Sequence, residues 1–129
     1  EYCGDQHSAM LAKVRVLPRP EFDKWLQDNP YKGLTLTEVG QVAFGAKCSV
    51  CHNPSAETKV GPGMLGIFGK NREFADGTSL VADENYIRES ILNPMAKVVK
   101  GYAGAMPTFL GQLSEDELNG LIEYLKTLK

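Results

Sequence analysis

The sequence has little of several features that mark common classes of protein. Its 129 residues include one tryptophan, two histidines and three cysteines, and the formal net charge is only −2. This weak charge gives no basic footprint for nucleic acid, so we expect no nucleic-acid partner. No apolar run approaches the length needed to span a bilayer, and no secretory signal is visible. The length favours one compact domain with room for a short appendage.

Because cysteine and histidine are scarce, their spacing carries much of the chemical information. Cys48, Cys51 and His52 form the pattern C-x-x-C-H, which is the attachment motif of c-type haem. Each thiol can form a thioether to the porphyrin edge, and the histidine is then held under the iron as an axial ligand. The motif predicts one covalent haem c, and a carrier of electrons rather than an enzyme.

Two other uses of a C-x-x-C pair compete with this prediction. A structural zinc site needs four ligands, and outside the motif the chain offers only Cys3 and His7. A thiol-disulfide redox pair is expected within a βαβ pattern, and strand-like segments are almost absent here. Both alternatives are therefore disfavoured.

A haem iron also needs a ligand on its second face, and methionine is a suitable donor. The four methionines are Met10, Met64, Met95 and Met106. Each one taken singly is more often a packing residue. Met106 lies in the glycine-containing loop 101–107, which is flexible enough to place a thioether on the far haem face. We predict Met106 as the second ligand, with Met95, which follows Asn93-Pro94, as the alternative.

Local signals predict where the helices begin and end. Capping boxes at Thr35-x-x-Glu38 and Ser114-x-x-Glu117 indicate two helix starts. The first helix is expected to run to Cys48 with an apolar face formed by Val39, Val42, Ala43 and Ala46. The last is expected to present Leu118, Leu121, Ile122 and Leu125. A third helix is predicted over 83–92, ended by Asn93-Pro94, with glycine-rich loops over 61–77 and 101–107.

The first 33 residues follow a different pattern. Val14 to Leu17 alternate like a short strand that Pro18 and Pro20 end. Residues 21–27 are predicted to form a short helix with Phe22, Trp25 and Leu26 on one side, before a linker over 29–33.

These residues resemble the class I cytochromes c. Gly40-x-x-x-Phe44 is similar to the first-helix signature of that family, in which the glycine lets the first and last helices cross closely. The resemblance implies Leu121 and Tyr124 as crossing partners, and a Pro62 carbonyl that accepts a hydrogen bond from the proximal histidine. It implies an all-α fold, with three main helices around one covalently bound haem and a short irregular, strand-like N-terminal appendage. The axial ligands would then be His52 and Met106.

The N-terminal residues resemble a second family. Cys3, His7 and Met10 offer the mixed sulfur and imidazole ligands that suit copper. They resemble the end of the dinuclear copper motif C-x-E-x-C-x-x-x-H-x-x-M of cytochrome c oxidase subunit II, with Glu1 at a further ligand position. The motif's first cysteine and its distant histidine are absent, so we expect these four positions to hold no copper here. The alternative is a chance C…H…M pattern in a polar tail.

The two resemblances together indicate a caa-type oxidase, in which a cytochrome c domain follows the copper domain of subunit II. They imply that residues 1–33 are a remnant of the copper domain and its linker, and that 34–129 are the cytochrome c domain. The haem would take electrons from a soluble donor, either cytochrome c or another small redox protein. It would pass them to the copper domain and catalytic subunit I of a proton-pumping oxidase. The alternative is a free-standing, diffusible class I cytochrome c.

The same resemblance carries expectations about location and about the haem edge. The chain starts at Glu1 rather than Met, so we expect a soluble piece of a membrane-anchored subunit on the periplasmic or outer face of the bacterial cytoplasmic membrane. Candidates for holding the haem propionates are Arg72, Arg88 and Tyr102. Candidates for a basic ring around the haem edge are Lys70, Arg72, Lys97 and Lys100.

Overall fold

The computed structural model describes residues 14–28 and 30–129, apart from the side chains of Leu26 and Gln27. The chain divides into two units, Glu1–Lys32 and Gly33–Lys129, and each is described by itself. The described part of the first unit contains one helix, α1 (Arg19–Gln27). The predicted helix is therefore present and starts two residues earlier, with Pro20 in its first turn, where a missing N–H costs nothing. The Phe22 and Trp25 rings stack with centroids 5.7 Å apart.

The predicted strand at Val14–Leu17 is wrong. Residues 14–18 form no regular element, and the side chains of Val14 and Val16 are 90% and 89% exposed. A strand needs a partner for its backbone groups, and none is supplied to this segment within the described residues.

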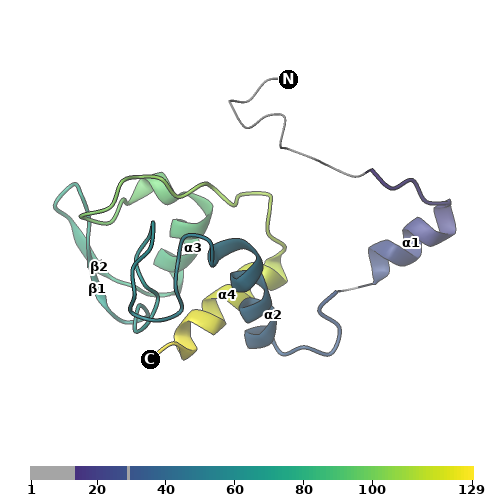
Figure 1. Cartoon of the computed structure of the whole chain (residues 1–129), viewed down its shortest axis with the longest axis horizontal. Helices are drawn as coiled ribbons and strands as arrows, with labels where there is room; N and C mark the ends of the chain where they lie inside the picture. Colours follow the sequence, from purple (N-terminus) through teal and green to yellow (C-terminus); the bar gives the residue numbers. More distant parts are fainter. Residues whose placement is uncertain (1–13, 29) are drawn as a thin grey trace, which may run out of the picture. The chain divides into compact units, whose positions relative to one another are not determined.

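Two helices with identical N-terminal capping form the frame of the second unit. Helix α2 (Leu36–Ala43) starts after Thr35, and helix α4 (Glu115–Thr127) starts after Ser114. In each, the hydroxyl accepts a hydrogen bond from the backbone N–H three residues on, and the glutamate there accepts one from the capping residue's N–H. Both predicted capping boxes are confirmed. The two helices cross in Figure 1, where α2 is dark blue and α4 is yellow.

The crossing depends on a glycine in each helix. A Cβ atom placed on Gly40 would lie 1.8 Å from the Gly120 carbonyl oxygen, and one placed on Gly120 would lie 2.7 Å from the Gly40 nitrogen. The predicted close approach at Gly40 is therefore present, but its nearest partner is Gly120, which the sequence pattern did not indicate. Phe44 and Tyr124 meet beside the crossing, with ring centroids 5.4 Å apart.

The apolar face predicted for α2 is only half right. Val39 and Ala43 are buried as expected, whereas Val42 is 51% exposed and Ala46 is also exposed. The buried side instead includes Gly40 and Phe44. The crossing at Gly40 turns that side of the helix toward α4, which leaves Val42 facing away.

Helix α3 (Glu84–Leu92) lies where a helix was predicted over 83–92. Its cap is Asp83, whose carboxylate accepts a hydrogen bond from the Tyr86 N–H at 2.8 Å. The helix ends at Asn93, before Pro94, and a short 3-10 turn, η3 (Pro94–Ala96), follows. The predicted end at Asn93-Pro94 is confirmed.

A small antiparallel hairpin replaces part of the predicted loop over 61–77. Strands β1 (Asn71–Glu73) and β2 (Ser79–Val81) pair with Arg72 opposite Leu80. Phe74, which is 2% exposed, bridges to Val99 beyond α3. The loop prediction fails at 71–73 because the pairing depends on a tight turn at Gly77, with φ +85°, and on the burial of Phe74. The polar strand residues themselves show little β preference.

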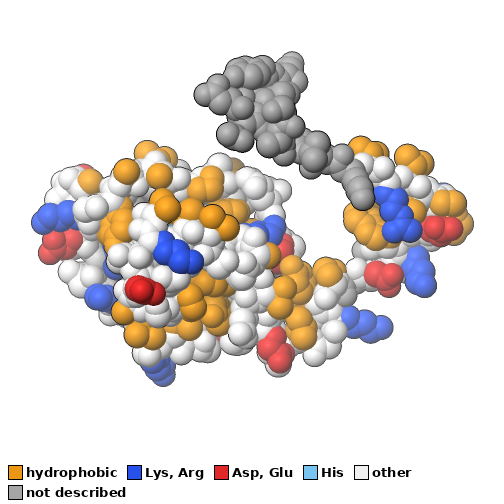
Figure 2. Space-filling view, in the orientation of Figure 1, with side chains coloured by type: hydrophobic (Ala, Val, Ile, Leu, Met, Phe, Trp, Pro, Cys, Tyr) orange, Lys and Arg blue, Asp and Glu red, His pale blue; other side chains and the backbone are white. Residues whose placement is uncertain are grey.

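The second unit is thus a helical fold with one short hairpin, and its core joins α2, α3, α4 and the hairpin. The core consists of the buried residues Ala43, Phe44, Met64, Ile67, Phe74, Ala82, Tyr86, Ile87, Ile91, Leu118, Leu121, Ile122 and Leu125. The predicted arrangement of three main helices is confirmed. Apolar side chains also gather on the face of this unit shown in Figure 2. Over the described residues, no helix has the length and apolar character needed to cross a membrane.

Candidate functional site

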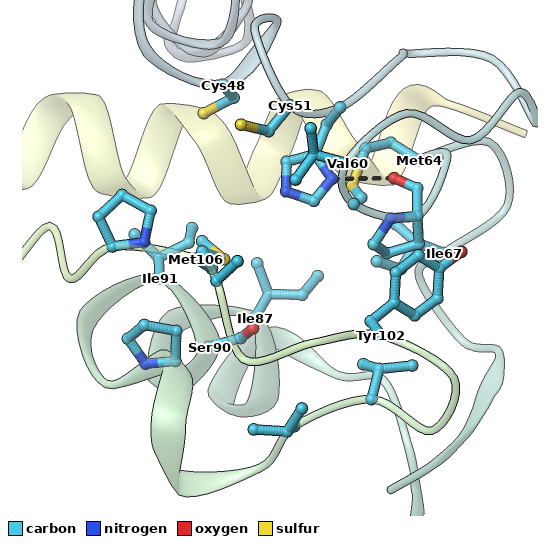
Figure 3. Close-up of a pocket in the computed structure, with 18 of the residues that line it drawn as sticks. Cys48, Cys51, Val60, Met64, Ile67, Ile87, Ser90, Ile91, Tyr102 and Met106 are labelled. Carbon is cyan, nitrogen blue, oxygen red and sulfur yellow. Dashed lines mark hydrogen bonds between the residues drawn. The ribbon is translucent and has the colours of Figure 1, made fainter. Parts of the chain in front are cut away.

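A deep, mostly apolar cleft opens between the end of α2, helix α3, helix α4 and the segment 94–107. It holds about 1240 Å³ of empty space when its open mouth is counted. Five predicted site residues line it together: Cys48, Cys51, His52, Pro62 and Met106. In Figure 3 the Cys48 and Cys51 side chains lie along one edge of the cavity, and Met106 enters it from the opposite loop.

The last turn of the first helix, which carries Cys48, is wider than an α-helical turn. Residues Phe44–Cys48 form a π-helical turn, η2, closed by the Ser49 N–H donating to the Phe44 carbonyl at 2.9 Å. The His52 N–H then donates to the Cys48 carbonyl at 2.9 Å. Single π-turns often occur at functional sites, and this one places Cys48 in the cleft wall. The sequence pattern predicted a helix up to Cys48 but carried no signal for the wider turn.

Lys47, which also lines the cleft, anchors this turn. Its ammonium donates to the Gln112 carbonyl at 2.9 Å and lies 3.6 Å from the Glu117 carboxylate. The turn is thereby tied to the start of α4. Sequence reasoning did not indicate Lys47, because its partners lie more than sixty residues away.

The Cys48 thiol is held in its protonated form. Burial raises its pKa to about 11, with the nearby Lys47 lowering it and Cys51 raising it further. Only the thiolate is a strong nucleophile, so the folded site keeps Cys48 unreactive at neutral pH.

The His52 ring is oriented by the Gly61-Pro62 pair. Its Nδ1 lies 2.8 Å from the Pro62 carbonyl oxygen, drawn as the dashed line in Figure 3. A carbonyl oxygen only accepts, so Nδ1 carries the proton and the lone pair of the neutral ring is on Nε2. A Cβ atom on Gly61 would lie 2.3 Å from His52 Cε1, so the ring can take this position only beside a glycine.

Three of the four methionines line the cleft, in different surroundings. Met64 is 6% exposed and belongs to the core, and Met106 is half-buried against that core. Met95 is 62% exposed. Met10 lies outside the described residues, as do Glu1, Cys3 and His7, so the structure does not bear on the predicted copper remnant.

The three residues predicted to hold the haem propionates have different surroundings. Arg72 and Tyr102 line the cleft, and the buried Arg72 Nε has no hydrogen-bond partner within the described part of the chain. Arg88 instead bonds Asn119 and lies 3.4 Å from Glu115. The expectation that Arg88 serves the propionates is therefore not supported, because its guanidinium is engaged between α3 and α4.

The lysines proposed for a basic ring are partly neutralised. Lys97 lines the cleft but pairs with Glu89, and Lys100 lies 3.1 Å from Glu73. Their positive charges are compensated locally, which weakens any ring of free cations at the mouth.

The donor set fits a covalent haem. Two thiols and the imidazole of one short turn line a large apolar cleft, and a thioether enters from the loop across it. A buried guanidinium nitrogen that lacks a partner suits an anionic group such as a propionate. Over residues 14–28 and 30–129, no group of three or more His, Cys, Asp or Glu side chains is placed to hold a metal ion.

Comparison with known proteins agrees with this geometry. The cytochrome c family model matches residues 37–129. The chain belongs to the cytochrome c family, whose members carry electrons through covalently bound haem c. Cys48, Cys51 and His52 occupy the family's C-x-x-C-H attachment motif.

Two groups of relatives stand out. The chain is 30% identical over 140 residues to cytochrome c oxidase subunit 2 of Bacillus sp. (strain PS3) and 31% identical over 140 residues to that of Bacillus subtilis (strain 168). Each match covers all of this chain but 38% of the relative. Cytochrome c2 of Blastochloris viridis is 32% identical over 91 residues, which cover 62% of this chain and 68% of that protein.

Proposed function

We propose that this chain relays electrons from a soluble donor to the copper centre of a terminal cytochrome c oxidase. The observation that carries the proposal is the extent of the oxidase match. It covers 100% of this chain, including the residues before 37, where the cytochrome c family match begins. The cytochrome c2 match covers only 62%. The first 33 residues are then what remains of the copper domain and its linker, and residues 34–129 are the cytochrome c domain.

A bound haem supplies one-electron exchange at its iron. The protein's part is to hold that iron in one ligand environment. Cys48 and Cys51 would attach the porphyrin, and His52 Nε2 and Met106 Sδ would face the iron from opposite sides. The hydrogen bond from His52 Nδ1 to the Pro62 carbonyl sets the neutral tautomer with its lone pair on Nε2 and strengthens that nitrogen as a ligand. Arg72 would neutralise a propionate.

The apolar walls of the cleft would influence the reduction potential of a bound haem because they exclude water. Phe44, Ile87, Ile91 and Leu121 are buried and line the cleft. Exclusion of water disfavours the more highly charged, oxidised form of a haem. This exclusion and a thioether ligand would both raise the reduction potential. With His52 and Met106 both bound to the iron, no site would remain open for oxygen, so the proposed role is transfer of electrons and not catalysis on this chain.

The larger assembly follows from the same proposal. The donor is cytochrome c or another small redox protein, and the acceptor is the copper domain, which passes electrons on to catalytic subunit I. Glu1, Cys3, His7 and Met10 would ligate copper only in the full-length subunit. That subunit would be anchored in the cytoplasmic membrane with this domain on its outer, periplasmic face.

Stopped-flow kinetics on the full-length, haem- and copper-loaded protein test the relay. After rapid reduction of the haem by a small donor, we expect its reoxidation to be independent of protein concentration, because donor and acceptor share one chain. Copper-depleted protein should stay reduced. A reoxidation rate that rises in proportion to added copper-containing acceptor, with no first-order phase, would instead support a diffusible cytochrome c.

The assignment of Met106 needs its own test. Met106→Ala should remove the weak methionine–iron absorption band near the red end of the spectrum and open the iron to added imidazole. Met64→Leu is the matched control, since Met64 is a core methionine in the same cleft, and it should retain the band. If Met106→Ala leaves the band unchanged, the ligand is another methionine, with Met95 the first candidate.

A further inference from the structure

We propose that Met95 is a positioning residue that supports the loop carrying Met106. Its thioether packs against Gly104, two residues before Met106, and so holds the segment 103–107 over the cleft. The inference rests on the proposed function of Met106 as the second iron ligand. It gives Met95 a role other than the ligand role that its sequence context offered.

The ends of the Met106 loop are firmly anchored. At its start, the Ala75 N–H donates to the Val98 carbonyl and the Lys100 N–H to the Glu73 carbonyl, both at 2.9 Å, which ties the chain to the hairpin. At its end, the Thr108 hydroxyl donates to the Leu92 carbonyl at 2.6 Å, at the end of α3. The segment 98–108, called the strap below, is thus anchored at both ends.

The middle of the strap lacks such anchors. Over the described residues, the only backbone hydrogen bond within 103–107 runs locally, from the Ala105 N–H to the Ala103 carbonyl at 2.7 Å. No backbone hydrogen bond joins these five residues to the rest of the described chain. Side-chain packing must therefore determine where this segment lies.

Met106 itself packs against the core, and Met95 supplies the packing at Gly104. A Cβ atom placed on Gly104 would lie 2.8 Å from Met95 Cε and 3.0 Å from Met95 Sδ, with Val98 Cγ2 next at 3.4 Å. Gly104 is not among the glycines with positive φ, so its backbone conformation does not require glycine. The missing side chain serves instead to let the Met95 thioether approach the strap.

The short turn that carries Met95 is itself anchored to the fold. Met95 lies in the 3-10 turn Pro94–Ala96, where Pro94 is buried and the Ala96 N–H donates to the Asn93 carbonyl at 3.0 Å. The turn directly follows α3. A side chain that is 62% exposed yet lines the cleft is therefore placed at the mouth, between α3 and the strap.

Imidazole binding to the oxidised, haem-loaded protein measures how often Met106 leaves the iron. We expect Met95→Ala to tighten imidazole binding by roughly threefold to eightfold, as removal of a partly buried methionine predicts. Met95→Leu, which keeps the volume but cannot ligate iron, should stay within about twofold of the wild type. Leu110→Ala is the control, because Leu110 is 70% exposed, close in sequence and absent from the cleft wall, and it should change nothing.

A double-mutant cycle isolates the contact itself. Gly104→Ala should also tighten imidazole binding, because the new methyl group displaces the Met95 thioether. In the Met95→Ala background the same change should have less effect, so the two substitutions combine to less than the product of their separate effects. Strictly multiplicative effects would contradict a shared contact.

The outcomes separate this inference from the proposed ligand. If Met106→Ala loses the red band while Met95→Ala binds imidazole as the wild type does, Met106 remains the ligand and the positioning role is wrong. If Met106→Ala keeps the band and Met95→Leu loses it, Met95 is itself the ligand, and both proposals are wrong.

Discussion

Replacing Gly40 by alanine should destabilise this protein more than the addition of one methyl group suggests. The new Cβ would lie 1.8 Å from the Gly120 carbonyl oxygen, 2.2 Å from the Gly120 carbonyl carbon and 2.8 Å from the Leu121 nitrogen. All three atoms belong to the backbone, so no side-chain rotation relieves the overlap and the two helices must move apart. Overpacking a core costs up to about 3 kcal/mol, and better helix propensity returns about 1 kcal/mol. The net loss in free energy of unfolding is then about 2 kcal/mol.

Gly45 provides the matched control. It lies one helical turn further on, and a Cβ atom there meets nothing within 4 Å. Gly45→Ala should therefore stabilise the protein by about 0.5–1 kcal/mol. Gly120→Ala, whose Cβ would meet the Gly40 nitrogen and the Leu36 oxygen at 2.7 Å, should fall between the two.

Denaturant unfolding of the haem-loaded variants, followed by far-ultraviolet circular dichroism, measures this order. For a domain of this size, 2 kcal/mol corresponds to a fall in Tm of roughly 8–16 °C. A Gly40→Ala protein as stable as the wild type, or a Gly45→Ala protein equally destabilised, would refute the argument that backbone contact at Gly40 determines the crossing.

Four further predictions concern the haem cleft and the N-terminal copper positions. Gly61→Ala should displace the His52 ring, because its Cβ would lie 2.3 Å from Cε1, and so break the hydrogen bond to Pro62 that strengthens this ligand. We expect a higher reduction potential by voltammetry, and an unchanged potential would contradict the role of this hydrogen bond. In the folded haem-free protein, the Cys48 pKa of about 11 leaves only about one thiol in a thousand ionised at pH 8, so iodoacetamide should label Cys48 far more slowly than after unfolding. The Cys48 pKa is raised above its ordinary value of 9.0, so the haem-free protein should lose stability as pH rises from about 9 to 11. A thioether at Cys48 would abolish this pH dependence. Equal labelling of the folded and unfolded protein, or a stability that does not change with pH, would count against the buried thiol. Copper titration of this chain should give no intense thiolate charge-transfer bands, and strong bands would show that Cys3, His7 and Met10 retain a site.

Much of the frame was predictable because its signals are local. Each capping box joins residues only three positions apart, and Asn93-Pro94 ends a helix through its own backbone sterics. The hairpin, the strand predicted at Val14–Leu17 and the orientation of Val42 could not be predicted in this way. Each depends on whether a partner segment lies alongside, and periodicity within one segment does not contain that information.

The sequence by itself determined the chemistry, because Cys48, Cys51 and His52 are contiguous and their attachment pattern needs no fold to be recognised. It also indicated that Gly40 allows close approach of two helices. Only the tertiary structure showed that the Gly120 backbone approaches Gly40 and that the His52 ring lies against Gly61. The same holds for Lys47 on the π-turn, the unpartnered Arg72 Nε and the Met95 contact with Gly104. These contacts join segments that are far apart in the chain or turn on ångström-scale spacing, and only packing of the whole domain brings them together.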